Sequence, residues 1–353
     1  MPYNRGMTQL HLLLPFGLPP EELARDLLRE LKTPALAMLL ARARRTAHRG
    51  IDGFSRALPH EILLAQVLGL GHHDTESSPA LAAAAMRHFG LSGENGTWFI
   101  VQPVHLHIAR DHLVLTDPRQ LALSETDARA LFDTVKPLFD EYGCTLLYGD
   151  AQRWFLRADD WSALHTATPD AASGHNIDIW MPKGAHERDW RRLQNEVQMH
   201  WHGHAVNDAR EMAGGKPVNS LWLWGAASVP FETNASVTSF VAQNSTNPFA
   251  TAAAKTVPAA SVNDILRAAP QNGVLLLDEL TGLALANAWA EWLAAFQKYE
   301  ADWFAPLLDA LQSGKLGRLE ITVSHDSAYA TYAADKSSLR KFWRAPSLAV
   351  LAP

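Results

Sequence analysis

Short apolar runs alternate with segments of helical periodicity near both ends of the chain. Gln9–Leu14, Gly273–Leu277 and Leu319–Val323 are apolar runs of strand length, each followed by polar or turn-forming residues. Continuous apolar runs are typical of strands buried on both faces of a parallel sheet. The pattern therefore predicts an α/β core with a mostly parallel sheet and helices on both faces.

Helical segments are marked by proline near their first turn or by alanine-rich composition. The predicted helices cover residues 20–31, 34–45, 59–68, 79–89 and 286–312, and a break in the last is expected near Pro306. Ser220–Trp224 is a further apolar run that reads as a strand, closed by Gly225. These elements complete the predicted core.

The middle of the chain has a different pattern of apolar and polar positions, in which two predicted hairpins flank one predicted helix. The helix is expected to begin at Ser124, with Asp127 three residues later as in a capping box, and to end near Tyr142. The hairpins are expected at 98–115 and 145–156. Hairpin, helix and hairpin predict a small α+β domain at 93–204, inserted into a core built from 1–92 and 205–353.

Composition narrows the class of protein. The chain has 353 residues, with 31 Lys and Arg against 37 Asp and Glu, a net charge of −6. This balance disfavours a general nucleic-acid or membrane-surface role. A single cysteine, Cys144, excludes an intramolecular disulfide, and no export signal or membrane span is recognised, so a cytoplasmic location is expected.

The most informative polar residues lie between 204 and 219. His204, Asn207 and Arg210 recur at helical spacing and would share one face, and Asn219 follows just before the apolar strand. An arginine fork with hydrogen-bonding neighbours suits phosphate or carboxylate. The pattern predicts an anion-binding site at these four residues; the alternative is a surface helix that feeds a core strand.

This segment also resembles a known family block. Archaeal-type cofactor-independent phosphoglycerate mutases, of the alkaline phosphatase superfamily, carry a block of the form H-P-[VI]-N-x-x-R…G…P-x-N-x-[IL]-W-L-W-G. The chain keeps that order with Ala205 in place of the proline, and is similar to a bacterial offshoot described as RpfE-type regulatory proteins. The resemblance implies an alkaline-phosphatase-like core, an inserted α+β domain, two divalent metals and a Ser or Thr nucleophile.

Several positions depart from the pattern that the resemblance implies. Phe16 stands where the first aspartate ligand is expected, and Glu61 stands in the turn that should hold the nucleophile. Asp278 is retained at the next strand end, but Gly282 replaces a histidine ligand. At the last strand end, the expected Asp-His pair is transposed to His325-Asp326. Asp278, His325 and Asp326 could hold at most one weakly bound divalent ion.

Two functions remain open on this basis. The first is a phosphoglycerate-mutase-like protein with degraded metal and nucleophile sites, acting as a non-catalytic regulatory or ligand-binding protein. The alternative is a divergent metal-dependent phosphomutase or phosphatase acting on a small phosphorylated metabolite. No cofactor beyond that single ion is expected, and the expected partners are a small phosphorylated or carboxylated ligand and a second protein, with neither nucleic acid nor membrane.

Overall fold

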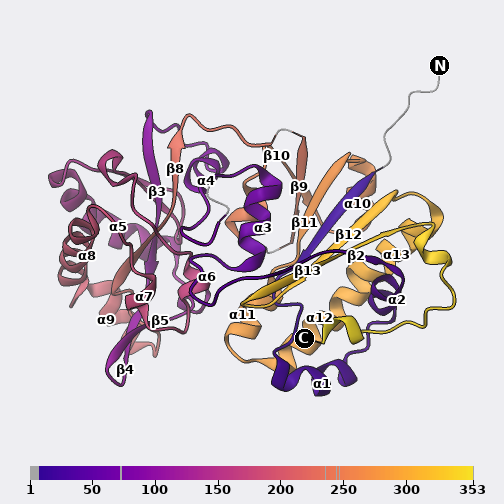
Figure 1. The fold of residues 1–353 in the computed structure, drawn as a ribbon. Coiled ribbons are helices and arrows are strands. Elements are labelled where there is room, and N and C mark those ends of the chain that lie inside the picture. Colours follow the sequence, from indigo (N-terminus) through magenta and orange to yellow (C-terminus); the bar gives the residue numbers. More distant parts are fainter. Residues whose placement is uncertain (1–7, 72–73, 235, 244, 246, 353) are drawn as a thin grey trace. The chain divides into compact units, whose positions relative to one another are not determined.

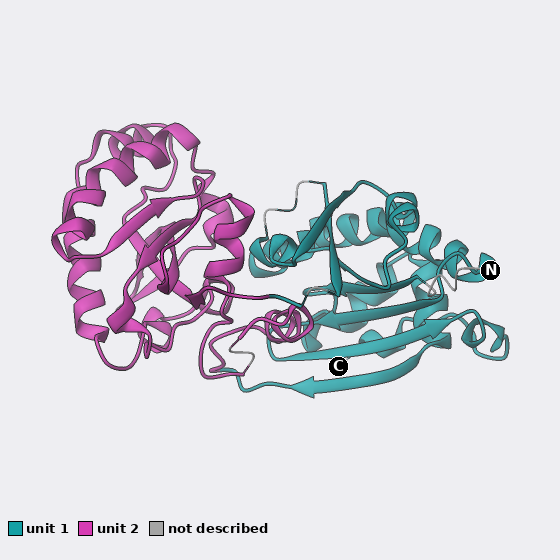
Figure 2. Ribbon diagram, turned by 90° about the horizontal axis from the view of Figure 1, so that it is seen from above, with its two compact units in different colours: residues 1–53, 233–353 teal, residues 54–232 magenta. Residues whose placement is uncertain are grey.

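The computed structural model describes residues 8–71, 74–234, 236–243, 245 and 247–352. The chain divides into two compact units, coloured separately in Figure 2. Unit 1 comprises Met1–Gly53 and Thr233–Pro353, and unit 2 comprises Phe54–Glu232. In the described part of the chain, no helix is both long enough and apolar enough to cross a membrane.

Unit 1 is built on a mixed, mostly parallel sheet (Figure 1). The strand order is β10-β9-β11-β1-β12-β13-β2, with parallel pairing from β10 to β12 and antiparallel pairing of β13 and β2. Its strands are β1 (Gln9–Leu14), β2 (Arg44–Gly50), β9 (Val237–Ala242), β10 (Lys255–Ala259), β11 (Asn272–Leu276), β12 (Arg318–Ser324) and β13 (Ala328–Asp335).

The core of unit 1 lies around β1. Leu12 pairs with Leu275 on one side and Ile321 on the other. Leu13 and Leu14 are at most 1% exposed, and because successive side chains point to opposite faces, both faces of β1 are covered. The predicted α/β class, with a mostly parallel sheet, is confirmed.

Two helices of unit 1 lie near their predicted positions, two others were not predicted, and the long predicted helix is broken at a different place. They are α1 (Glu21–Glu30), α2 (Pro34–Arg42), α10 (Val262–Ala268), α11 (Glu279–Leu285), α12 (Trp289–Tyr299) and α13 (Ala305–Ser313). The long predicted helix starts at Trp289 and widens into a π-helical turn at Glu300–Phe304, whereas Pro306 sits in the first turn of α13. Proline has no N–H to donate to the preceding turn, and the widened turn directly before α13 accommodates that missing bond.

Unit 2 contains an antiparallel sheet in the order β6-β7-β3-β8 and a separate hairpin. The sheet strands are β3 (Gly96–Val104), β6 (Thr145–Tyr148), β7 (Trp154–Arg157) and β8 (Ser220–Val229), and the hairpin is β4 (Leu106–Ala109) with β5 (His112–Leu115). Its helices are α3 (Pro59–Leu68), α4 (Ala82–His88), α5 (Glu125–Glu141), α6 (Pro169–Ala172), α7 (Ile177–Trp180), α8 (Glu187–Trp201) and α9 (Ala205–Met212). Buried tryptophans fill its core; Trp154, for example, packs edge-to-face on Trp201.

The boundary between the units differs from the predicted one. β8 begins with the apolar run that was assigned to the α/β core, yet it pairs antiparallel with β3. Leu221–Trp224 are at most 3% exposed, so both faces are covered, and periodicity alone does not distinguish a strand of this sheet from a strand of a parallel one. Residues 54–92 and 205–232 therefore belong to unit 2 rather than to unit 1.

The middle hairpins were predicted in part. β6 and β7 form the expected second hairpin. The first is shorter than expected, because β3 ends at Val104 and pairs with β7 and β8, while β4 alone pairs with β5. The predicted helix after Ser124 is α5, with the Ser124 hydroxyl accepting the Asp127 N–H at 3.1 Å.

Candidate functional site

His204 and Asn207, the first half of the predicted anion site, lie at the start of α9 and bond mainly to backbone. His204 is the N-cap residue: its Nδ1 accepts the Val206 N–H at 3.2 Å, and its Nε2 lies 3.1 Å from Thr134 Oγ1. Asn207 is 5% exposed; its amide donates to the carbonyls of Trp201 and Val218 at 3.0 and 2.9 Å and accepts the Val218 N–H at 2.8 Å. Asn207 thus links Trp201, at the end of α8, to Val218, just before β8.

Arg210 and Asn219 use their side chains in the same way. The Arg210 guanidinium donates to the carbonyl of Lys216 at 2.9 Å and to that of Leu121. Asn219 exchanges two hydrogen bonds of 2.8 Å with the backbone of Leu106, as a neighbouring strand would. The four predicted residues are brought into one region of unit 2, and their polar atoms fix its backbone.

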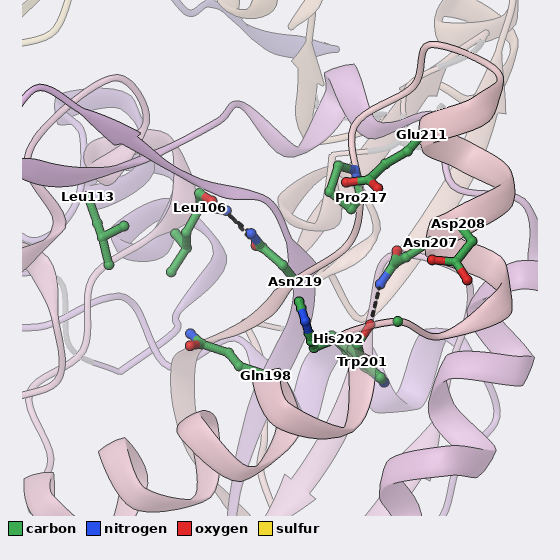
Figure 3. Close-up of a pocket in the computed structure, with 11 residues that line it drawn as sticks. Leu106, Leu113, Gln198, Trp201, His202, Asn207, Asp208, Glu211, Pro217 and Asn219 are labelled. Carbon is green, nitrogen blue, oxygen red and sulfur yellow. Dashed lines mark hydrogen bonds between the residues drawn. The ribbon is translucent and has the colours of Figure 1, made fainter.

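A cavity of about 580 Å³ opens beside this region, between α8, α9 and the β4–β5 hairpin. Figure 3 shows Leu106 and Leu113 at one end, Asp208 and Glu211 at the other, and Asn219 between them. The residues that line the cavity are Leu106, Leu113, Gln198, Trp201, His202, Gly203, Asn207, Asp208, Glu211, Pro217 and Asn219. Its lining carries two carboxylates and neither arginine nor lysine, so the local charge favours a neutral or cationic group over an anion.

Glu61, in the turn where the resemblance places a nucleophile, serves as a helix cap. It stands at the third position of α3, and its Oε2 accepts the Leu58 backbone N–H at 2.7 Å, which satisfies one of the free donors of the first turn. The same oxygen accepts the Thr168 hydroxyl hydrogen at 2.7 Å. The residue is 4% exposed, so its carboxyl group is enclosed by protein.

His60 and Asp170 complete a buried cluster around Glu61. One ligand-type atom of each of the three residues lies within 4.8 Å of the others. Asp170 forms a two-point ion pair with Arg119, at 2.8 and 3.1 Å, and Arg119 also bonds to Asp117. Arg119 places a positive charge directly behind the cluster.

Burial governs the ionisation of this cluster. Desolvation, with the nearby Asp170 carboxylate, raises the pKa of Glu61 to about 8, although its bonds to Thr168 and Leu58 and the charge of Arg119 act in the opposite direction. Desolvation also lowers the pKa of His60 to about 4. Both side chains are therefore uncharged near neutral pH, which keeps the buried charge low.

The strand ends of unit 1 hold the other expected ligand positions. Phe16 is 8% exposed, has a φ of 53°, and its carbonyl accepts the Trp292 indole N–H at 2.9 Å. Asparagine and aspartate adopt this left-handed backbone more readily than phenylalanine does, so the strand end keeps a geometry that suits the aspartate implied by the resemblance. The aromatic side chain itself offers no metal ligand.

Asp278, His325 and Asp326 do not form a three-ligand cluster. Within the described residues, the set of ligand atoms that lie within 4.8 Å of one another is the His60 cluster. Asp278 accepts a hydrogen bond from Ser245 at 3.3 Å, and the His325 Nδ1 lies 2.9 Å from the Asp326 carboxylate. These residues do not fit the two-metal arrangement that the resemblance implies.

Sequence reasoning missed the partners of Glu61. His60 is adjacent to Glu61 in sequence, but no local pattern links Glu61 to Thr168 or Asp170. A weak signal was available, because Thr168-Pro169-Asp170 is a helix-start pattern and Thr168 does cap the short helix α6. The contact between Glu61 and Thr168 spans 107 residues and follows only from the fold.

Comparison with known proteins gives a weak relative in sequence. No protein-family model matches the chain. A curated 2,3-bisphosphoglycerate-independent phosphoglycerate mutase from Methanosarcina mazei is 24% identical over 221 residues, which cover 60% of this chain and 53% of that protein. The match thus spans about half the length of that relative.

Solved structures add a likeness in fold. The PH0037 protein from Pyrococcus horikoshii superposes with a TM-score of 0.55 at 12% identity, covering 94% of this chain and 88% of that one. The cofactor-independent phosphoglycerate mutase from Thermoplasma acidophilum gives a TM-score of 0.44 at 13% identity, covering 98% and 94%. The similarity to RpfE-type proteins stays a prediction. The chain is similar in sequence to cofactor-independent phosphoglycerate mutases, and it shares the fold of the PH0037 protein.

Proposed function

We propose that the chain is a phosphoglycerate-mutase-like protein that does not transfer phosphoryl groups and acts instead by binding a ligand or a regulatory partner. The observation that carries the proposal is Glu61. Its carboxyl group occupies the turn where a nucleophile is implied, is 4% exposed, and caps α3 through the Leu58 N–H. A phosphoryl acceptor must reach its substrate and be activated, and a buried neutral carboxyl group does neither.

The metal positions support the same proposal. Phosphoryl transfer in this superfamily relies on two cations that neutralise phosphate charge. Phe16 offers no ligand atom, and His325 is engaged with Asp326 rather than with Asp278. The proposed protein therefore keeps the mutase-like fold without the donor set that the reaction needs.

The cavity beside α9 is the proposed ligand site. Asn207 and Asn219 support its walls, whereas Asp208 and Glu211 supply its charge. A phosphorylated or carboxylated ligand would need Arg210 to leave the carbonyls of Lys216 and Leu121. The present geometry thus favours a neutral or cationic ligand over the anion expected from the sequence.

A direct assay tests the absence of phosphoryl transfer. The full-length chain is incubated with 2-phosphoglycerate and 3-phosphoglycerate, with and without Mn²⁺, beside a Glu61→Gln variant. We expect no interconversion by either protein. Turnover by the wild-type chain that is abolished in Glu61→Gln would show that the protein is an active enzyme.

One observation favours the alternative of a metal-dependent phosphatase. His60, Glu61 and Asp170 offer one nitrogen and two carboxylate donors, a combination that can hold Mn²⁺ or Zn²⁺ once Glu61 loses its proton. Arg119 opposes a cation there, because its guanidinium already neutralises Asp170. Phosphatase activity on small phosphate esters that requires added metal and disappears in His60→Gln would establish this alternative.

A further inference from the structure

The outer edge of the sheet in unit 1 is unusually basic. β2 is the last strand in the sheet order, and every residue from Arg44 to Gly50 is exposed except Ala47, which is half-buried. The strand carries Arg44, Arg45 and Arg49. Charged residues on an edge strand also prevent unwanted strand pairing, so the arginines alone do not indicate a partner.

The segment that follows β13 lies against the start of this strand. Lys341 Nζ donates to the Arg42 carbonyl at 3.0 Å, and the Arg344 guanidinium donates to the Ala41 carbonyl at 3.3 Å. Arg42 in turn donates to the carbonyl of Leu339 at 2.8 Å. These bonds hold residues 339–344 beside the end of α2, where β2 begins (Figure 1).

Two large aromatic side chains project from that segment. Phe342 is 81% exposed and Trp343 is 71% exposed. Their rings meet edge-to-face, with centroids 5.4 Å apart and planes at 81°. Leaving both in water is unfavourable, and edge protection does not explain them.

The two segments that meet here are strongly basic in sequence, although the exposed Asp335 lies within electrostatic reach of Lys341. Residues 42–49 and 340–344 contain seven arginine or lysine residues (Arg42, Arg44, Arg45, Arg49, Arg340, Lys341 and Arg344) and neither aspartate nor glutamate. The whole chain has the opposite balance, 31 basic against 37 acidic residues. The segments 42–49 and 340–344 are called the basic aromatic patch below.

Contrary to the expectation from the net charge of the whole chain, we propose that the basic aromatic patch docks on an anionic phospholipid surface, independently of the proposed function. Tryptophan and phenylalanine settle at the boundary between headgroups and acyl chains, while arginine and lysine bind the lipid phosphates. Single-stranded nucleic acid needs ring faces on which successive bases can stack. The perpendicular rings of Phe342 and Trp343 present no common stacking face, so the geometry favours lipid.

Co-sedimentation with vesicles tests the proposal on the full-length chain. We expect binding to phosphatidylserine-containing vesicles that weakens with added salt, and no binding to phosphatidylcholine vesicles. The double variant Phe342→Ala/Trp343→Ala and the double variant Arg44→Gln/Arg49→Gln should each weaken binding about tenfold or more. All four side chains are exposed, so unchanged thermal unfolding should confirm that both variants fold.

Matched variants outside the patch test whether binding depends on the patch itself or only on the positive charge and exposed apolar surface of the whole protein. Arg188→Gln/Arg191→Gln removes two exposed arginines from α8, and Ile108→Ala removes a side chain that is 77% exposed on β4. Both controls should bind as the wild type does. Equal binding by the patch variants, absence of binding to anionic vesicles, or binding of a single-stranded oligonucleotide in place of vesicles would each overturn the proposal.

Discussion

Thr168 donates its hydroxyl hydrogen to Glu61 at 2.7 Å, joining the start of α6 to the first turn of α3. The same Glu61 oxygen accepts the Leu58 N–H. The carboxyl group of Glu61 therefore caps α3 and links it to Thr168, the N-cap residue of α6. A residue bound in this way is part of the fold, which is why its position in the implied nucleophile turn argues against catalysis.

The buried cluster should make stability depend on pH in two opposite directions. Because the pKa of Glu61 is raised from 4.5 to about 8, its contribution to stability is fully present below pH 4.5 and is lost as the pH rises from 4.5 to 8. Because the pKa of His60 is lowered to about 4, stability rises between pH 4 and 6.5.

Urea unfolding from pH 4 to 9 measures both effects. Because the two effects offset each other between about pH 4.5 and 6.5, the wild-type stability should fall mainly above pH 6.5. Glu61→Gln should match the wild type near pH 5 and exceed its free energy of unfolding by a few kcal/mol at pH 8.5, whereas His60→Gln should remove the offset, so that its stability falls from about pH 4.5 onward. Glu141→Gln changes an exposed carboxyl group at the end of α5 and should leave the profile unaltered. A profile of Glu61→Gln parallel to that of the wild type would show that Glu61 is ionised in the folded protein.

Asn207→Leu should destabilise unit 2 strongly. The change removes three hydrogen bonds; the Trp201 carbonyl keeps the His204 N–H at 3.2 Å, but both backbone groups of Val218 lose the partner given by Asn207. Each unsatisfied buried group costs about 1–3 kcal/mol, so a loss of about 3 kcal/mol or more is expected in chemical denaturation. Asp208→Ala, at the next and exposed position, should change stability by less than about 0.5 kcal/mol.

Arg210→Ala distinguishes a structural from an anion-binding role. Since its guanidinium donates to the Lys216 and Leu121 carbonyls, we expect a loss of about 1–3 kcal/mol in the free energy of unfolding. Arg191→Ala, an exposed arginine on α8, serves as the control. Unaltered stability of Arg210→Ala, combined with at least tenfold weaker binding of a phosphorylated ligand in calorimetry, would restore the role expected from the sequence.

Metal content checks the ligand positions. Protein purified without an affinity tag and dialysed at pH 7 should retain less than one divalent ion per chain, because Phe16 supplies no ligand and Glu61 holds a proton. Elemental analysis by mass spectrometry measures this ratio. Two stoichiometric Mn or Zn ions per chain would contradict the proposed loss of the metal site.

The strands that could be predicted are those with continuous apolar runs. β1, β11 and β12 were located within a few residues because burial on both faces leaves an unbroken hydrophobic pattern. β2 was missed, because an exposed strand with three arginines has no apolar periodicity and depends on its pairing with β13. β8 was assigned to the wrong sheet for a different reason: its continuous apolar pattern does not specify which strand it pairs with.

The sequence does not show what the polar residues of the candidate site bond to. Asn207 and Asn219 line the same cavity, yet their hydrogen bonds go to the backbone of Val218 and Leu106. The sequence alone does not show whether an asparagine side chain bonds to a ligand or to a backbone group. The His60, Glu61 and Asp170 cluster depends on a contact between distant segments, which local patterns do not contain.

Phosphorus NMR of 2-phosphoglycerate and 3-phosphoglycerate mixed with a high concentration of the full-length chain and Mn²⁺ tests the central claim most directly. Because Glu61 does not act as a nucleophile in this account, we expect the ratio of the 2-phosphoglycerate and 3-phosphoglycerate resonances to stay at its starting value over hours. Conversion toward equilibrium by the wild-type chain, lost in Glu61→Gln and retained in Glu141→Gln, would contradict the proposed non-catalytic role.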